Sequence, residues 1–197
     1  MRDLSSALLI VLLVALVASC GSFGRKPPRD LGNACSIVTQ RPDFRRAFQK
    51  AERRWNVPVH TQMAIIYQES RFVGTAQPPR RMWLGFFPGR RASTAYGYAQ
   101  VLDGTWDDYT KSTGRRWASR NDIGDAADFI GWYMNQTRKR NGVALSDTRN
   151  QYLAYHEGHT GYGRGSYRGK RALLRTAAAV AERARRYQRQ LARCRAL

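Results

Sequence analysis

Acidic residues are scarce in this sequence of 197 residues. It contains 14 Asp and Glu residues against 34 Lys and Arg residues, which gives a formal net charge of +20. A chain this basic favours a polyanionic partner or an anionic surface. Nucleic acid, anionic lipid and acidic cell-wall polymer all meet that description, and the charge does not choose between them.

Metal-binding patterns and strand patterns are also lacking. The three cysteines and three histidines form no Cys-x-x-Cys or His-rich spacing, which is the pattern typical of metal sites. We therefore expect neither a metal nor another cofactor. There is no internal repeat, and the period-2 alternation of apolar and polar residues that is typical of strands is scarce, so we predict a mainly α-helical fold.

The N-terminus carries one long apolar run, residues 4–17, after Met-Arg-Asp. The run is short for a permanent membrane span, and its length fits the apolar part of a secretory signal. It ends in Val-Ala-Ser-Cys-Gly at 17–21, which resembles a bacterial lipobox. The resemblance implies a lipoprotein signal peptide over residues 1–19 and lipidation of Cys20. The alternative is an ordinary signal peptide cut at another small residue.

This signal predicts a place in the cell envelope. We expect a lipid-anchored protein, and Gly21 rather than Asp after the cysteine implies the outer membrane, facing the periplasm, if the bacterium is Gram-negative. The remaining cysteines are Cys35 and Cys194. Because exported proteins fold in an oxidising space, we predict a disulfide between them, and the alternative is two buried thiols.

The rest of the chain divides into a tether and one domain. Residues 20–34 are rich in Gly, Pro and basic residues and predict a flexible tether, and residues 35–197 form the domain. Apolar spacing of three and four residues predicts helices over 42–55, 61–70, from 103 or 105 onward, from 121 or 122 to 141, 147–158 and 171–195. Residues 73–95 predict a long loop, serving either the substrate or the packing of the core.

The candidate catalytic group is Glu69, at the end of an apolar helical segment. Tyr67 lies two residues before it and Phe72 three residues after it. Burial and the negative end of the helix dipole both raise a carboxyl pKa, so that the group can hold a proton near neutral pH and deliver it to a leaving oxygen. Taken alone, a helical Glu is usually a solvated surface residue.

Three short motifs give this carboxyl a context. They are Gln-Glu-Ser-Arg-Phe at 68–72, Gly-Tyr-Ala-Gln-Val at 97–101 and Ala-Tyr-His-Glu-Gly at 154–158. Their order resembles the soluble-lytic-transglycosylase (SLT) domain, a lysozyme-like family that cuts peptidoglycan, over about residues 40–165. The resemblance implies a mainly α lysozyme-like domain, here with an added C-terminal helix.

The resemblance also implies roles for individual residues. Glu69 matches the catalytic acid/base. The matches for substrate binding are Ser70, the hydroxyl beside it, Gln100, which lines the sugar cleft, and Tyr155, near the catalytic carboxyl. We add Tyr98, which stands where the family has Leu. The implied reaction cleaves the β-1,4 bond between N-acetylmuramic acid and N-acetylglucosamine and leaves a 1,6-anhydro ring.

Other functions compete with this one. A lysozyme-type hydrolase would need a base for water, with Glu157 or Asp103 as candidates, and His156 and His159 are further candidate acid/base groups. A non-catalytic peptidoglycan-binding lipoprotein is a rival of another class. The expected partners are peptidoglycan glycan strands and, through Cys20, a membrane. The export signal argues against nucleic acid.

Overall fold

Helices make up most of the structure. The computed structural model describes residues 26–83 and 87–194, so the expected signal peptide and Cys20 lie outside the described residues. The helices are α2 (Ala34–Gln40), α3 (Pro42–Trp55), α4 (Val59–Ser70), α5 (Asp103–Thr113), α6 (Ile123–Asn141), α7 (Thr148–Gly163) and α8 (Arg171–Cys194). The mainly α-helical prediction is confirmed. No helix in the described part of the chain is long and apolar enough to span a membrane.

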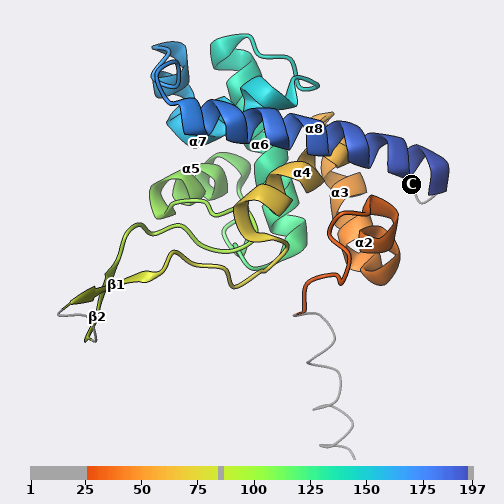
Figure 1. Cartoon of the computed structure of the whole chain (residues 1–197), viewed down its shortest axis with the longest axis horizontal. Helices are drawn as coiled ribbons and strands as arrows, with labels where there is room; N and C mark the ends of the chain where they lie inside the picture. The colour runs from red at the N-terminus through yellow and green to blue at the C-terminus, as the bar shows by residue number, and fades with distance from the viewer. Residues whose placement is uncertain (1–25, 84–86, 195–197) are drawn as a thin grey trace, which may run out of the picture.

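The central helix is α6, which lies behind α4 and α8 and packs along α3 (Figure 1). Two features allow this close approach. A Cβ atom at Gly131 would lie 2.4 Å from the Trp55 ring, so only glycine fits there. The carboxylate of Asp128 is buried and accepts hydrogen bonds from Trp55 Nε1 at 2.9 Å and Tyr109 Oη at 2.7 Å. Asp128 of α6 thus links α3 and α5 to α6, and these hydrogen bonds compensate for the burial of its charge.

Helix α4 is enclosed by its neighbours. From Thr61 to Ile66 every residue is buried, which is the pattern of a helix with no solvent face. Helix α8 crosses over α4 and α7 and provides much of this cover (Figure 1). Its inner face is apolar, as its spacing predicted, and its outer face carries the exposed arginines 171, 175, 185, 186, 189 and 193.

The predicted loop at 73–95 contains a β-hairpin. Strands β1 (Arg80–Trp83) and β2 (Phe87–Arg91) are antiparallel, with Arg80 opposite Arg91. The hairpin extends away from the helices (Figure 1). The prediction of a loop was wrong at this point, because two short strands that include a proline and a glycine produce no period-2 pattern.

The segment just before Cys35 packs on the helices. Pro28 is buried, and Arg41 Nη1 donates a hydrogen bond to the carbonyl oxygen of Lys26 at 2.9 Å. Asn33 caps α2, a helix that the sequence did not predict, by accepting from the Cys35 amide at 3.0 Å. Residues 26–33, within the expected tether, therefore contact the domain.

The first and last described helices are joined through Cys35 and Cys194. The structure places their sulfur atoms at bonding distance, with the Cα atoms 6.1 Å apart and the two cysteines 159 positions apart in sequence. Nearby, Gln190 Nε2 donates to the Gly32 carbonyl at 3.2 Å. The bond holds α8 in place at its C-terminal end.

We expect replacement of both Cys35 and Cys194 by Ser to lower the free energy of unfolding by about 3–5 kcal/mol, because the bond removes loop-closure entropy from the unfolded chain. Urea denaturation of the oxidised wild type, the reduced wild type and the double variant would measure this loss. Alkylation of both thiols in native, unreduced protein would contradict the disulfide.

Candidate active site

Glu69 lies in the last turn of α4, where the helix stops abruptly. Arg71 and Phe72 take left-handed conformations, with φ of 52° and 60°. Phe72 is buried and stacks on Phe44, with ring centroids 5.7 Å apart. This stacking anchors the residues just after α4 to α3, and so it fixes the backbone at the end of the helix that carries Glu69.

Beside Glu69 opens a cleft of about 550 Å³. Its lining comes from the C-terminal end of α4, the segment before α5, and helices α5, α6 and α7. The lining residues are Glu69, Ser93, Gln100, Val101, Leu102, Thr105, Phe129, Tyr133, Tyr155, His156, Glu157 and Gly158. The structure thus brings together three predicted site residues, namely Glu69, Gln100 and Tyr155.

The environment of Glu69 favours its neutral form. Burial raises the pKa of its carboxyl to about 7, and hydrogen bonding from the Tyr152 side chain partly opposes that shift. Burial raises the pKa of the Tyr152 and Tyr155 hydroxyls above the ordinary value, and the nearby Glu69 carboxyl raises the pKa of both further. A carboxyl with a pKa near neutrality can act as an acid in one step and as a base in the next.

Tyr155 holds α7 against the second motif. Its hydroxyl donates a hydrogen bond to the carbonyl oxygen of Ala99 at 2.5 Å. Gln100, with φ of 47°, turns its side chain back so that Nε2 donates to the carbonyls of Ala76 and Gly97, both at 2.8 Å. These bonds fix the floor of the cleft beside Glu69.

Gly97 makes that floor possible. Its φ is 81°, and a Cβ atom built there would lie only 2.0 Å from the carbonyl oxygen of Arg120. Any side chain would therefore clash with the backbone, which explains why the second motif has a glycine at this position. The next amide, that of Tyr98, donates to the same Arg120 oxygen at 3.1 Å.

Two predicted substrate-binding residues lie elsewhere. Ser70 is 6% exposed, and its hydroxyl donates to the Ile66 carbonyl of its own helix at 3.2 Å. Tyr98 is 4% exposed and packs edge-on against Phe44. Neither residue lines the cleft. Tyr98 belongs to the core because the turn at Gly97 points its ring inward. The ring is therefore not placed to contact a substrate in the cleft, contrary to the prediction.

Glu157 lines the cleft but is already engaged. Its carboxylate accepts hydrogen bonds from Lys170 Nζ at 2.8 Å and from the Ser166 hydroxyl, and it lies 3.1 Å from His156 Nδ1. Lys170 and Ser166 lower its pKa to about 2. A carboxylate held this firmly in its ionised form is a weak proton acceptor. The other candidate base, Asp103, forms an ion pair with Arg120 at 2.7 Å.

The two candidate histidines differ in their surroundings. His159 stacks on Tyr133, with ring centroids 4.3 Å apart, and its Nε2 lies 3.1 Å from the Thr137 hydroxyl. Burial lowers the pKa of His159, so the ring is neutral at physiological pH and serves packing. His156 is exposed at the edge of the cleft.

Sequence reasoning missed Tyr152 as a partner of Glu69. The signal was available, because Tyr152 precedes Tyr155 by three residues and positions three apart share one face of a helix. It also missed Leu102, a cleft residue that stays 48% exposed. An exposed leucine in a polar cleft offers an apolar surface to a ligand.

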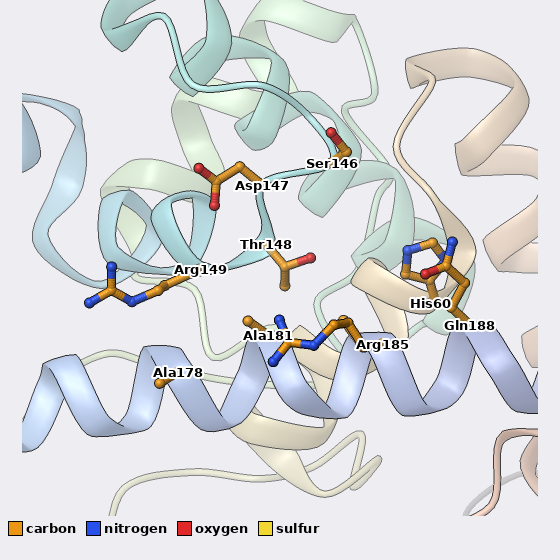
Figure 2. A pocket seen from close by; sticks show the side chains of 10 residues that line it. His60, Ser146, Asp147, Thr148, Arg149, Ala178, Ala181, Arg185 and Gln188 are labelled. Carbon is orange, nitrogen blue, oxygen red and sulfur yellow. The ribbon is translucent and has the colours of Figure 1, made fainter.

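A separate hollow of about 430 Å³ lies between the N-terminal ends of α4 and α7 and the face of α8 (Figure 2). His60, Arg149 and Arg185 contribute to its wall. Its carboxylate, Asp147, accepts hydrogen bonds from the amide and side chain of Asn150, capping α7. Glu69 is not part of this hollow, which leaves the cleft as the candidate active site.

Comparison with known families agrees with this geometry. The family model described as "Transglycosylase SLT domain" matches residues 8–194. The chain therefore belongs to the transglycosylase SLT domain family, whose activity is of the lytic transglycosylase type on peptidoglycan. No curated protein matches the chain.

We expect Glu69→Gln to change how stability depends on pH. The folded pKa of about 7 exceeds the ordinary 4.5, so the folded state binds a proton that the unfolded chain releases between these values. Glu69 therefore makes the wild type progressively less stable as the pH rises through this window, and Gln does not titrate. The variant should gain up to about 3 kcal/mol over the wild type between about pH 4 and pH 8.

Chemical denaturation across this pH range measures the difference in the free energy of unfolding. Asp108→Asn, at an exposed carboxyl of α5, is the matched control and should not acquire this profile. A difference between Glu69→Gln and the wild type that stays constant with pH would contradict the shifted pKa.

Proposed function

We propose that this protein is a peptidoglycan lytic transglycosylase in which Glu69 acts as both general acid and general base. The bond cleaved is the β-1,4 link between N-acetylmuramic acid and N-acetylglucosamine, and the product carries a 1,6-anhydro ring. The observation that carries the proposal is the state of the two cleft carboxyls. Glu69 has a pKa near 7, whereas Glu157 is held ionised by Lys170 and Ser166.

The reaction begins with neutral Glu69. Its proton passes to the glycosidic oxygen, the bond from that oxygen to C1 of the muramic acid breaks, and N-acetylglucosamine leaves with a free 4-hydroxyl. Positive charge develops at C1, and the substrate's own N-acetyl oxygen stabilises it. Glu69, now a carboxylate, takes the proton from the C6 hydroxyl, and O6 bonds to C1. No water is consumed, and Glu69 ends protonated as it began.

This scheme needs one protein carboxyl, unlike the usual pair of carboxylates in glycosidases. Within the described residues, the cleft carboxyl other than Glu69 is Glu157, and its hydrogen bonds leave it poorly suited to activate water. A hydrolase is therefore less well supported than a transglycosylase. A purely binding lipoprotein would have no use for a carboxyl with a pKa near neutrality.

The neighbours of Glu69 have supporting roles in this proposal. Tyr152 donates to the carboxylate form and so stabilises Glu69 after its proton has left. Tyr155 and Gln100 shape the floor through their bonds to backbone carbonyls. Leu102 offers the apolar contact that the face of a sugar ring accepts.

We also propose that the protein is lipid-anchored in the cell envelope through Cys20, at the outer membrane and facing the periplasm. The apolar run and the lipobox-like sequence support this placement. The exposed arginines on α8 suit an acidic wall or anionic lipid headgroups. Peptidoglycan is within reach of a protein tethered there.

We expect Glu69→Gln to lower turnover by about 10²–10⁴-fold while the fold is kept, because the amide is nearly isosteric but supplies no proton. Mass spectrometry of the sugars released from purified peptidoglycan would check this, with wild type and variant compared. The wild type should release anhydro-muropeptides. Products heavier by one water would mean hydrolysis, and unchanged turnover in the variant would refute Glu69 as the catalyst.

Glu157→Gln is the matched variant at the other cleft carboxyl. It should still form the anhydro product, because Glu157 transfers no proton in the proposed scheme. Loss of turnover equal to that of Glu69→Gln, in a folded protein, would favour a two-carboxylate mechanism instead.

We expect Tyr152→Phe to move the alkaline limb of the activity profile to higher pH, by up to about one pH unit. The wild type should lose activity as the pH rises through the Glu69 pKa of about 7, since the acid is then ionised. Without the tyrosine hydroxyl the ionised form loses a hydrogen bond, so that pKa rises. A profile of kcat/KM against pH tests this, and a limb that moves to lower pH would contradict it.

A further inference from the structure

A second, more open hollow of about 810 Å³ adjoins the catalytic cleft. Ser93 lines both, so the two spaces meet at the segment between the hairpin and α5. The residues around the second hollow are Gln77, Arg90, Arg91, Ser93, Thr94, Ala95, Tyr96, Asp103 and Arg120. A ligand that fills the cleft can therefore continue into this space without leaving the surface.

Two of the three arginines here are held in place. Arg120 Nη1 donates to the carbonyls of Thr94 and Val101, both at 3.1 Å, and its guanidinium lies over the Tyr96 ring at 5.3 Å. Arg91 Nη1 donates to the Pro78 carbonyl at 2.5 Å. Guanidinium groups held this way lose little freedom when they bind a ligand.

The charge of the hollow is unbalanced. Asp103 forms an ion pair with Arg120 at 2.7 Å, which accounts for one of the three cations. Arg90 and Arg91 are exposed and form no ion pair with any residue in 26–83 or 87–194. Two arginines without a carboxylate partner, beside a fixed third, form a site for carboxylates.

Only one part of the glycan strand carries such groups. The N-acetylated sugar rings are neutral, whereas the peptide on the lactyl group of each muramic acid bears free carboxylates. That peptide starts on the same sugar whose bond is cut in the proposed function, so it must leave the cleft close to Glu69. The adjoining hollow is the cationic space continuous with that point.

We propose that this hollow binds the carboxylates of the stem peptide, with Arg90 and Arg91 as the residues that make peptide-bearing strands the preferred substrate. The inference rests on the proposed function. The hairpin strand β2 carries both arginines, and both line the hollow that adjoins the cleft. Arg120 and its partner Asp103 shape the wall behind them.

The test compares two substrates and two double variants. The substrates are glycan strands that keep their peptides and strands stripped of them by an amidase, which keep one lactyl carboxylate on each muramic acid but none of the peptide carboxylates. With peptide-bearing strands, Arg90→Gln/Arg91→Gln should raise KM about tenfold and leave kcat largely intact, while values on stripped strands stay the same. Arg45→Gln/Arg46→Gln removes the same charge from the exposed face of α3 and should change neither substrate's KM selectively.

Three outcomes would overturn the inference. An unchanged KM on peptide-bearing strands shows that the arginines do not contact the peptide. An equal rise in KM on both substrates assigns them to the sugars. An equal selective rise in the α3 variant assigns the effect to overall charge. Arg90→Lys/Arg91→Lys, which keeps the charge but not the planar fork, should restore the KM only in part.

A direct binding measurement separates this inference from the proposed function. Calorimetry with free stem peptide, on full-length Glu69→Gln protein with and without the arginine substitutions, needs no turnover. Peptide binding that weakens about tenfold without Arg90 and Arg91 supports the site even if the wild type forms no anhydro product. Absence of such weakening overturns the site even if that product does form.

Discussion

The burial of one carboxyl governs how this site works. Glu69 can hold a proton near neutral pH because α3, α6 and α8 pack against α4, and the carboxyl at the end of this helix is poorly solvated. The raised pKa lowers the stability of the folded state progressively as the pH rises from about 4.5 to about 7. The protein bears that cost in the folded state, where packing of α4 and the disulfide to α8 offset it.

The remaining contacts place partners around this acid. Asp128 joins α3, α5 and α6 with a satisfied buried charge, and α6 in turn presents its aromatic face to the cleft. Tyr155 reaches from α7 to the Ala99 carbonyl, which couples the second and third motifs directly. The three motifs are far apart in sequence, and these few polar bonds are what make them one site.

Much of the fold was predictable, because long helices show a regular apolar spacing in the sequence. The observed bounds of α3, α6 and α8 lie close to the predicted ones. The hairpin and α2 were not, since both are short and lack a repeating pattern. At the site, Glu69, Gln100 and Tyr155 converge as expected. Ser70 and Tyr98 do not, because a motif gives neighbours in sequence but not the direction of a side chain. Tyr98 follows the left-handed turn at Gly97, and Ser70 lies on a buried side of α4, where its hydroxyl donates to the Ile66 carbonyl.

The proposed proton transfer and the proposed selection of substrate depend on two different kinds of structure in this chain. The proposed proton transfer needs a fixed, poorly solvated carboxyl, and Glu69 at the end of the largely buried helix α4 meets that need. The proposed selection among glycan strands uses the exposed arginines of the hairpin, whose charge salt screens more than it screens a buried charge. Because Arg90 and Arg91 lie on an element that projects from the helices, substitutions there can alter which strands bind without disturbing the burial that sets the pKa of Glu69. Among the described residues, Ser93 is the one that lines both the cleft of Glu69 and the basic hollow, so under these two proposals catalysis and substrate choice can change independently.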